Sequence, residues 1–380
     1  MAAHIAGGEI IALEVGPGGI QALEALWAEP VQHTDPFAEA TGSRRTLVLD
    51  AKREPLCAVD VDDDELVAAG VQDPTLVPLP LWAGAEALNG FSHFGAGARG
   101  GVLGAGWWDA THDRLRCVLE RCDRAQGFVV ATDAGGYGGV ARDLLAYAAD
   151  ECGRRPRVCV ARVHVEAASD LAHAAVALDA AVALRELRLE ADVVVPWRAG
   201  VAPVVALTAR PLRGRCSAHM DLEAWARFAR GPSAGAVGVL VDAAAGTGPD
   251  GPFAPVFFPA DEHPRDAARR DGLRVAAEPG AAAAPGLFWT PAADADDADA
   301  TIAEPDGRCA RLRAAGPGAA GTIRDLAAHA SFATKYNRLN TASSSSTGAV
   351  RAAAARADLD SDYLDEVWED LNAVADDAER

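Results

Sequence analysis

Two glycine-rich turns are the parts of this sequence whose residue types best suit the binding of an anion. The first turn, GPGGIQ, covers residues 16–21, and the second, AGGYGGV, covers residues 134–140. Each follows an apolar run typical of a buried strand and precedes a helical pattern. Backbone N–H groups of such a turn, together with the positive end of the next helix, attract negative charge. Glycine also serves tight turns that bind nothing, so the pattern predicts either a phosphate cradle or a structural bend.

The sequence lacks the motifs of better known nucleotide sites and hydrolases. Gln21 stands where a dinucleotide-binding fingerprint has its third glycine, and no P-loop with Gly-Lys-Ser/Thr follows either turn. Lys52 and Lys335 are the only two lysines, which argues against a lysine-clamped triphosphate. Zinc-type His and Cys spacings and a nucleophile elbow are also missing. The residues therefore predict no catalytic side chain and no metal ligand.

Composition narrows the class of protein. The 380 residues hold 55 acidic and 35 basic side chains, and the formal charge of −20 disfavours nucleic acid and anionic membranes as partners. The seven cysteines form no CxxC pair, which favours free thiols in a reducing compartment. No apolar stretch approaches the length of a transmembrane segment, and the first residues do not resemble an import signal. We expect a cytosolic location by default.

Alternating strands and helices must position the two turns. Strands are expected over residues 9–15, 45–51, 127–133 and 158–165, and helices over 109–125 and 140–152. This alternation predicts a doubly wound parallel sheet, with ligands at the carboxyl ends of its strands. The region from 71 to 106, rich in Pro and Gly, is expected to be mostly loop. Both turns should then lie side by side at one edge of the sheet.

The second half of the chain changes in composition and suggests further units. We expect a nucleotide-binding-type domain over residues 1–168, a connecting core helix over 169–192, an α+β second domain over 193–310, and a helical region with a Ser-rich linker over 311–380. The acidic run AADADDADA (residues 292–300) within the second domain is expected to be a loop. The last helical pattern places one apolar face toward the second half or toward a partner. That face consists of Leu364, Val367, Trp368 and Leu371.

Two stretches of the first domain resemble tubulins. EIIALEVGPGGIQALEALW resembles the tubulin amino terminus, in which a strand ends in a Gly-Gln-Cys-Gly-Asn-Gln turn, and it keeps Gly16, Gly19, Gln21 and Trp27. ERCDRAQGFVVATDAGGYGG resembles the tubulin passage Cys-Asp-x-x-Gln-Gly-Phe and the glycine-rich phosphate loop behind it. The residues that match this passage are Cys122, Asp123, Gln126, Gly127 and Phe128.

The departures from tubulin point to one branch of that superfamily. Tyr137 and Val140 replace small residues of the phosphate loop, and Lys52 stands where tubulin has a magnesium-binding Glu. The segment that completes a neighbour's GTPase site is missing. An Asp-x-Lys after the second strand and an aromatic residue before Gly-Val are similar to the Misato branch. LDAK, which contains Asp50, and GGYGGV fit that description.

This resemblance implies a tubulin-like doubly wound parallel sheet of Rossmann-like character, a smaller α+β second domain and C-terminal helices. It implies a role in mitochondrial organisation, distribution and inheritance without GTP hydrolysis. The implied partners are proteins, namely tubulin, a chaperonin or mitochondrial surface proteins, and the implied location is cytoplasmic, mitochondrial or both. The alternative is a divergent tubulin-like GTPase that binds GTP and polymerises.

The resemblance also implies where a nucleotide would bind. GTP or GDP would lie on the glycine turns, with Gln21 near the base and Asp50 near the phosphates; the alternative is an inherited turn geometry with an empty pocket. Lys52 would neutralise phosphate charge in place of the metal, or is a plain surface lysine. The implied nucleotide-binding residues are Gly16, Pro17, Gly18, Gly19, Gln21, Asp50, Lys52, Gly135, Gly136, Tyr137, Gly138 and Gly139.

Overall fold

The fold is taken from a computed structural model. It describes residues 8–27, 35–38, 44–50, 76–78, 103–163, 171–197, 212–213, 221–229, 239–247, 286–291, 298–303, 308–314, 324, 326–328 and 361–379. Of the helical region expected over residues 311–380, the structure describes 324, 326–328 and 361–379 as helical. The Ser-rich linker lies outside the described residues.

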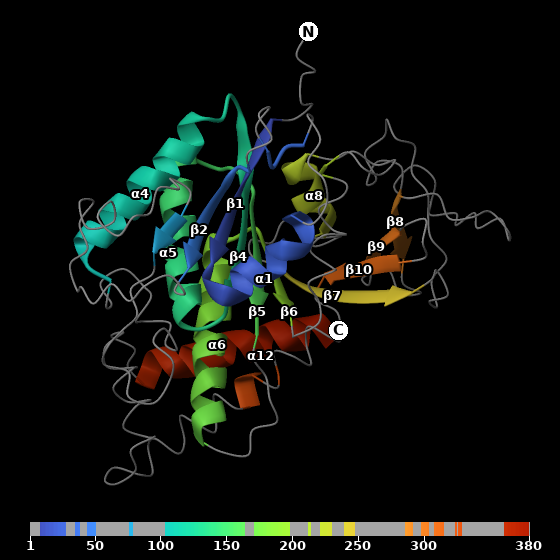
Figure 1. Ribbon diagram of the computed structural model, residues 1–380. Coiled ribbons are helices and arrows are strands. Elements are labelled where there is room, and N and C mark those ends of the chain that lie inside the picture. The colour runs from blue at the N-terminus through green and yellow to red at the C-terminus, as the bar shows by residue number, and fades with distance from the viewer. Residues whose placement is uncertain are drawn as a thin grey trace, which may run out of the picture.

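A parallel sheet occupies the centre of the structure (Figure 1). Its strands are β1 (Glu9–Val15), β2 (Thr46–Asp50), β3 (Leu76–Pro78), β4 (Ala125–Asp133), β5 (Arg157–Arg162) and β6 (Val193–Trp197). They lie in the order β3-β2-β1-β4-β5-β6, and every neighbouring pair is parallel. This order, with a switch between β1 and β4, is that of a doubly wound α/β sheet. The Rossmann-like α/β class expected from the sequence is confirmed.

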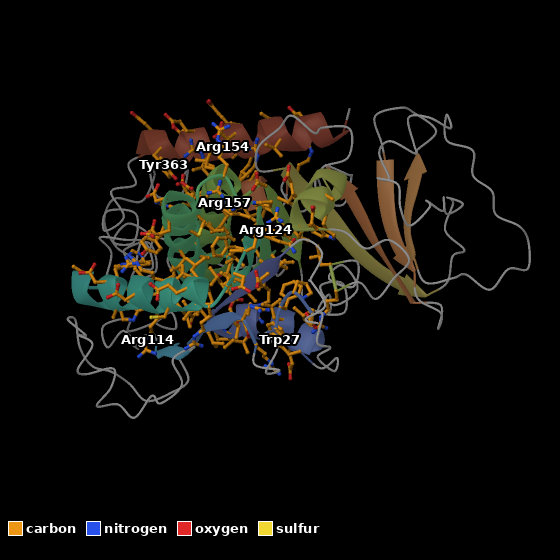
Figure 2. The ribbon with its side chains drawn as sticks, turned by 90° about the horizontal axis from the view of Figure 1, so that it is seen from above. Trp27, Arg114, Arg124, Arg154, Arg157 and Tyr363 are labelled. Carbon is orange, nitrogen blue, oxygen red and sulfur yellow. The ribbon has the colours of Figure 1, made fainter. Side chains whose placement is uncertain are left out.

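Helices cover the sheet in layers. In Figure 2, Trp27 at the end of α1 (Gly16–Trp27) lies on one side of the sheet, and Tyr363 of α12 (Ser361–Glu379) lies beyond the helices on the other. α4 (Ala105–Glu120), α5 (Gly136–Cys152) and α6 (Leu171–Glu190) share one hydrophobic core with alternate residues of the strands. β1 is buried over its whole length, as a central strand covered on both faces requires.

The sheet continues past the boundary that the sequence suggested at residue 193. α6 connects β5 to β6, which pair in parallel, so this helix is a crossover between neighbouring strands of the sheet. β6 pairs in turn with β7 (Val239–Thr247). Beyond β7 the strands are antiparallel in the order β7-β10-β9-β8, with β8 at Gly286–Pro291, β9 at Ala298–Ala303 and β10 at Arg308–Ala314.

The C-terminal helix packs on α6, and its Asp376 also pairs with Arg324 of the second half of the chain at 2.8 Å. Val367 and Leu371 of α12 are fully buried and join the main core, whereas Trp368 is 41% exposed. The face predicted for this helix was therefore wrong at Trp368, because the buried stripe is centred on Val367 and Leu371. Arg185 of α6 pairs with Asp370 of α12 at 2.7 Å and adds a polar contact.

Three further expectations need correction. The helix expected over residues 109–125 is α4 at Ala105–Glu120, since Arg121 caps it and β4 begins at Ala125. β3 lies within the region expected to be mostly loop, where pairing with β2 holds three residues in a strand. β9 begins inside the acidic run expected to be a loop. In the last two cases, pairing with a neighbouring strand overrides a local composition typical of loops.

Candidate functional site

The two glycine turns lie side by side at the carboxyl ends of the strands. β1 and β4 are parallel neighbours with Val15 opposite Thr132, and the turns begin directly after these strand ends. Gly16 has φ +71° and Gly135 has φ +110°, a backbone region that side chains strongly disfavour. The sequence-based expectation that both turns share one edge is confirmed. We call this edge, from Gly16 to Gly19 and from Asp133 to Gly139, the glycine rim.

The Tyr137 ring joins the two turns. A Cβ atom added to Gly16 would lie 2.5 Å from Cδ1 of Tyr137, so the ring lies directly against the first turn. Tyr137 itself belongs to the first turn of α5 and is partly buried. The aromatic side chain therefore occupies space between the turns that small residues would leave open.

The Asp133 side chain binds the first turn of α1. Its carboxylate is buried, and Oδ2 accepts a hydrogen bond from the Gly18 N–H at 2.6 Å. Arg162, the last residue of β5, donates from Nε to Oδ1 of Asp133 and from Nη1 to Oε1 of Gln21 at 2.7 Å. A Cβ atom on Gly18 would lie 2.1 Å from Oδ1 of Asp133, so only glycine permits this approach. The start of α1 therefore already holds an anion.

Neither Asp133 nor Arg162 was among the candidates taken from the sequence. Each is the last residue of a strand whose carboxyl end lies at the edge of the glycine rim. This position at a strand end is the sequence feature that could have identified them. Sequence reasoning concentrated on the glycines because they matched a known phosphate loop. A charged residue immediately before such a turn offers its side chain to the same N–H groups that would bind a ligand.

The other candidate residues are placed as follows. Asp50 ends β2 next to β1, with Leu49 opposite Val15, so its backbone lies at the same edge; its side chain and Lys52 lie outside the described residues. Gln21 is exposed and bound to Arg162. The remaining glycines lie in the first turns of α1 and α5 and serve packing at two points: Gly19 approaches the carbonyl of Ala131, and Gly138 approaches Ala183 of α6. Pro17, Gly136 and Gly139 also lie in these first turns.

The passage around Gln126 lies at the opposite edge of the sheet, where the strands begin. Gln126 donates to the carbonyl of Gly8 at 2.6 Å and accepts from the N–H of Leu222 at 2.8 Å. A Cβ atom on Gly127 would lie 2.1 Å from the Pro156 carbonyl oxygen, and Phe128 is fully buried. These matched residues hold neighbouring segments together and are distant from the glycine rim.

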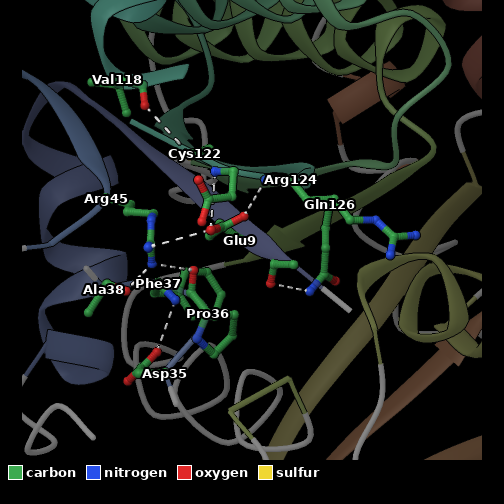
Figure 3. A network of polar contacts seen from close by, with 12 residues as sticks. Glu9, Asp35, Pro36, Phe37, Ala38, Arg45, Val118, Cys122, Arg124 and Gln126 are labelled. Carbon is green, nitrogen blue, oxygen red and sulfur yellow. Dashed lines mark hydrogen bonds and ion pairs between the residues drawn. The ribbon is translucent and has the colours of Figure 1, made fainter. Parts of the chain in front are cut away.

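A carboxylate network organises this amino-terminal edge (Figure 3). Glu9 accepts hydrogen bonds from the N–H groups of Arg124 at 2.8 Å and Asp123 at 3.3 Å. Arg45 lies 3.8 Å from Glu9 and also donates to the carbonyls of Pro36 and Ala38. The Glu9 side chain thereby ties the first strand to the loop that leads into β4.

A buried glutamate lies under α1, one strand residue below the rim. Oε1 of Glu14 accepts from Nε1 of Trp27 at 2.7 Å and from the Thr46 hydroxyl at 3.0 Å. Burial raises the pKa of this carboxyl above its ordinary value, and the two hydrogen bonds offset only part of that rise. Glu14 joins α1 to β1 and β2, so its role here is in packing.

Neither metal binding nor comparison with known proteins adds a function. Within the described part of the chain, no group of His, Cys, Asp and Glu side chains could hold a metal ion, and no helix is long and apolar enough to cross a membrane. No family model matches the chain, and no curated protein matches it. What the glycine rim offers chemically is two converging helix N-termini, a buried carboxylate and a guanidinium group.

Proposed function

We propose that this chain is a Misato-like protein of the tubulin superfamily that acts in mitochondrial organisation, distribution and inheritance and does not hydrolyse GTP. The strand order and the adjacent glycine turns support the comparison with a tubulin-like nucleotide domain. The observation that carries the proposal is the Tyr137 ring lying against Gly16. It fills the space between the two turns where a tubulin-type phosphate would lie.

Absence of turnover follows from what phosphoryl transfer requires. The reaction needs a metal ion or equivalent charge at the phosphates and a water molecule held in line. Lys52 replaces the metal-side carboxylate, and the sequence lacks the segment that positions water in a neighbour's site. Tyr137 and Asp133 occupy the turn itself. The chain would then act through protein contacts, with tubulin, a chaperonin or mitochondrial surface proteins as candidate partners in the cytoplasm or at mitochondria.

Nucleotide titration tests the biochemical half of this proposal. The purified protein is heated in the presence of GTP, GDP and Mg²⁺ at rising concentrations, and its nucleotide content is measured after purification. A ligand that binds the native state at 100 times its dissociation constant stabilises it by about 2.7 kcal/mol, which is readily visible as a rise in Tm. We expect no rise with any nucleotide and no release of phosphate at any protein concentration.

A second candidate function is a divergent tubulin-like GTPase that polymerises. The convergence of the α1 and α5 N-termini at one edge favours it, because two positive helix ends would attract a nucleotide phosphate. Phosphate release that grows with protein concentration would establish this candidate. It would exclude the proposal of a non-hydrolysing protein.

A cellular experiment tests the biological half. The gene is removed in the source organism, and mitochondrial distribution is scored before and after the intact chain is restored. In a parallel strain, the Leu144→Ala chain is restored instead of the intact one. Leu144 is fully buried, so this variant carries a cavity in the α5 core and shows the effect of lost stability alone. Normal mitochondria in cells without the chain would contradict the proposed role.

A further inference from the structure

We infer that the carboxylate of Asp133 is a built-in substitute for a ligand oxyanion and keeps the anion site at the start of α1 closed. The inference concerns the regulation of the glycine rim, and it rests on the proposed function in treating that rim as a phosphate-type turn. The rest of the inference depends only on the contacts of the Asp133 side chain.

The first step is the position of the carboxylate. Phosphates bind at helix N-termini because the N–H groups of the first turn have no partner within the helix. At α1 one of these groups, the Gly18 N–H, donates to Oδ2 of Asp133 at 2.6 Å. This distance is short even for a charge-assisted hydrogen bond. The side chain thus takes the place and the charge that a ligand oxygen would have.

The second step is the cation on the other side of the carboxylate. Arg162 donates to Oδ1 of Asp133, and its side chain is only 18% exposed. A guanidinium group and a helix N-terminus therefore face the same carboxylate from two elements, α1 and β5. Together they form the kind of cationic environment that selects a carboxylate or a phosphate. Removing the Asp133 carboxylate would leave both without their anion.

The third step is the available space. Oδ1, Cγ and Oδ2 of Asp133 would all lie within 2.6 Å of a Cβ atom on Gly18, so the carboxylate lies against the backbone of the turn. Asp133 is 5% exposed, and water cannot replace its charge. In an Asp133→Ala protein, the lost group has the composition of a carboxylate, so formate fits the vacated space. Inorganic phosphate presents the same oxygen chemistry with a larger volume.

The test is chemical rescue of Asp133→Ala. Its Tm is measured in sodium formate and in sodium phosphate, each against sodium chloride at equal ionic strength. We expect formate to raise the Tm of the variant by several degrees more than chloride does, and this rise should saturate with formate concentration. Phosphate should raise the Tm in the same way if the rim opens enough to admit its larger volume. Neither anion should raise the Tm of the wild-type protein more than chloride does.

Two control variants separate anion binding from general stabilisation. Leu144→Ala is destabilised by a buried cavity and should gain no more from formate than from chloride. Asp133→Asn keeps a side chain of the same shape in the site, and it should also show no rescue because the space stays filled. If Asp133→Ala does not fold in chloride, its yield of folded protein on refolding with formate becomes the measurement.

Two results would overturn the inference. One is a wild-type Tm that rises with formate or phosphate as much as that of Asp133→Ala, because the site would then be open. The other is an Asp133→Ala protein that formate and phosphate stabilise, or help to refold, no better than chloride does. Failure of this inference is distinguishable from failure of the proposed function. The proposed function fails if the wild-type protein hydrolyses GTP or if cells without the chain have normal mitochondria.

Discussion

The two edges of the β1–β4 strand pair use the same device in different settings. At the amino-terminal edge, the Glu9 carboxylate accepts N–H groups of the loop before β4; at the carboxyl edge, the Asp133 carboxylate accepts the N–H of Gly18. Glu9 binds an ordinary loop and lies near Arg45, whereas Asp133 binds the first turn of a helix that follows a glycine bend. A carboxylate at the first edge is a structural tie. At the second it stands where an anionic ligand would bind.

The largest expected effect comes from crowding the glycine rim. Gly18→Ala places a methyl group 2.1 Å from Oδ1 of Asp133, so the buried carboxylate or the turn must move. We expect a loss of about 3 kcal/mol in the free energy of unfolding, measured by urea denaturation. In a double-mutant cycle, Asp133→Gly should relieve part of this loss, because it removes the clashing group. Additive effects would show that the two residues do not interact.

The matching change at the other edge should cost less. Glu9→Ala leaves the N–H groups of Arg124 and Asp123 without their acceptor, and we expect a loss of about 2 kcal/mol. Unlike Asp133→Ala, this variant should not be rescued by formate, because among the described residues no helix N-terminus faces the vacated position. Glu24→Ala on the exposed face of α1 is the control and should leave the urea midpoint unchanged. Specific rescue of Glu9→Ala would remove the distinction between the two edges.

Gln126 offers a smaller test of the amino-terminal edge. Gln126→Ala removes one hydrogen bond to Gly8 and one to Leu222, and we expect a loss of about 1 kcal/mol. Hydrogen exchange at the Leu222 amide should become faster, since that amide loses its acceptor. Unchanged exchange would mean that the Gln126 side chain does not hold the start of α8 (Leu222–Ala229) in solution.

The smallest effect is a pH dependence just below the rim. Because burial raises the pKa of Glu14 in the folded state, the stability that its neutral form contributes is complete below the ordinary pKa and is lost as the pH rises through the raised one. Glu14→Gln keeps an oxygen for Trp27 and Thr46 but carries no charge. The variant should therefore be more stable than wild type at pH 7, with a difference that shrinks toward pH 4. Urea denaturation across this range checks the sign, and a constant difference would contradict it.

The sequence predicted the elements around the glycine rim well because their signals are local. A mostly apolar strand followed by a glycine-rich turn and then by a helical period occurs at both β1–α1 and β4–α5, and parallel pairing brings the two turns together. Periodicity was less reliable for individual side chains. The spacing of apolar residues predicted that Trp368 lies on the buried face of its helix, but its side chain is exposed. Its exposure depends on how α12 is rotated against α6, which is set by tertiary packing.

The polar contacts at the site could not be predicted in the same way. The Asp133–Gly18 hydrogen bond joins residues 115 positions apart, and Arg162 reaches Gln21 across 141 positions. No local pattern encodes such pairs. Periodicity alone could not show which strands α6 connects, because a helix that joins two parallel neighbours and one that joins two domains have the same periodicity. Only the pairing of β5 with β6 distinguishes them.

The packing of α12 on α6 bears on how the chain folds during its synthesis. α12 is made after every strand of the sheet, yet it supplies Val367 and Leu371 to the core shared with α5 and α6. Until the ribosome has released these residues, the surface of α6 that packs against Val367 and Leu371 lacks that cover. A nascent chain with such a surface is prone to aggregation. A chaperone that shields α6 during translation would therefore raise the yield of native protein.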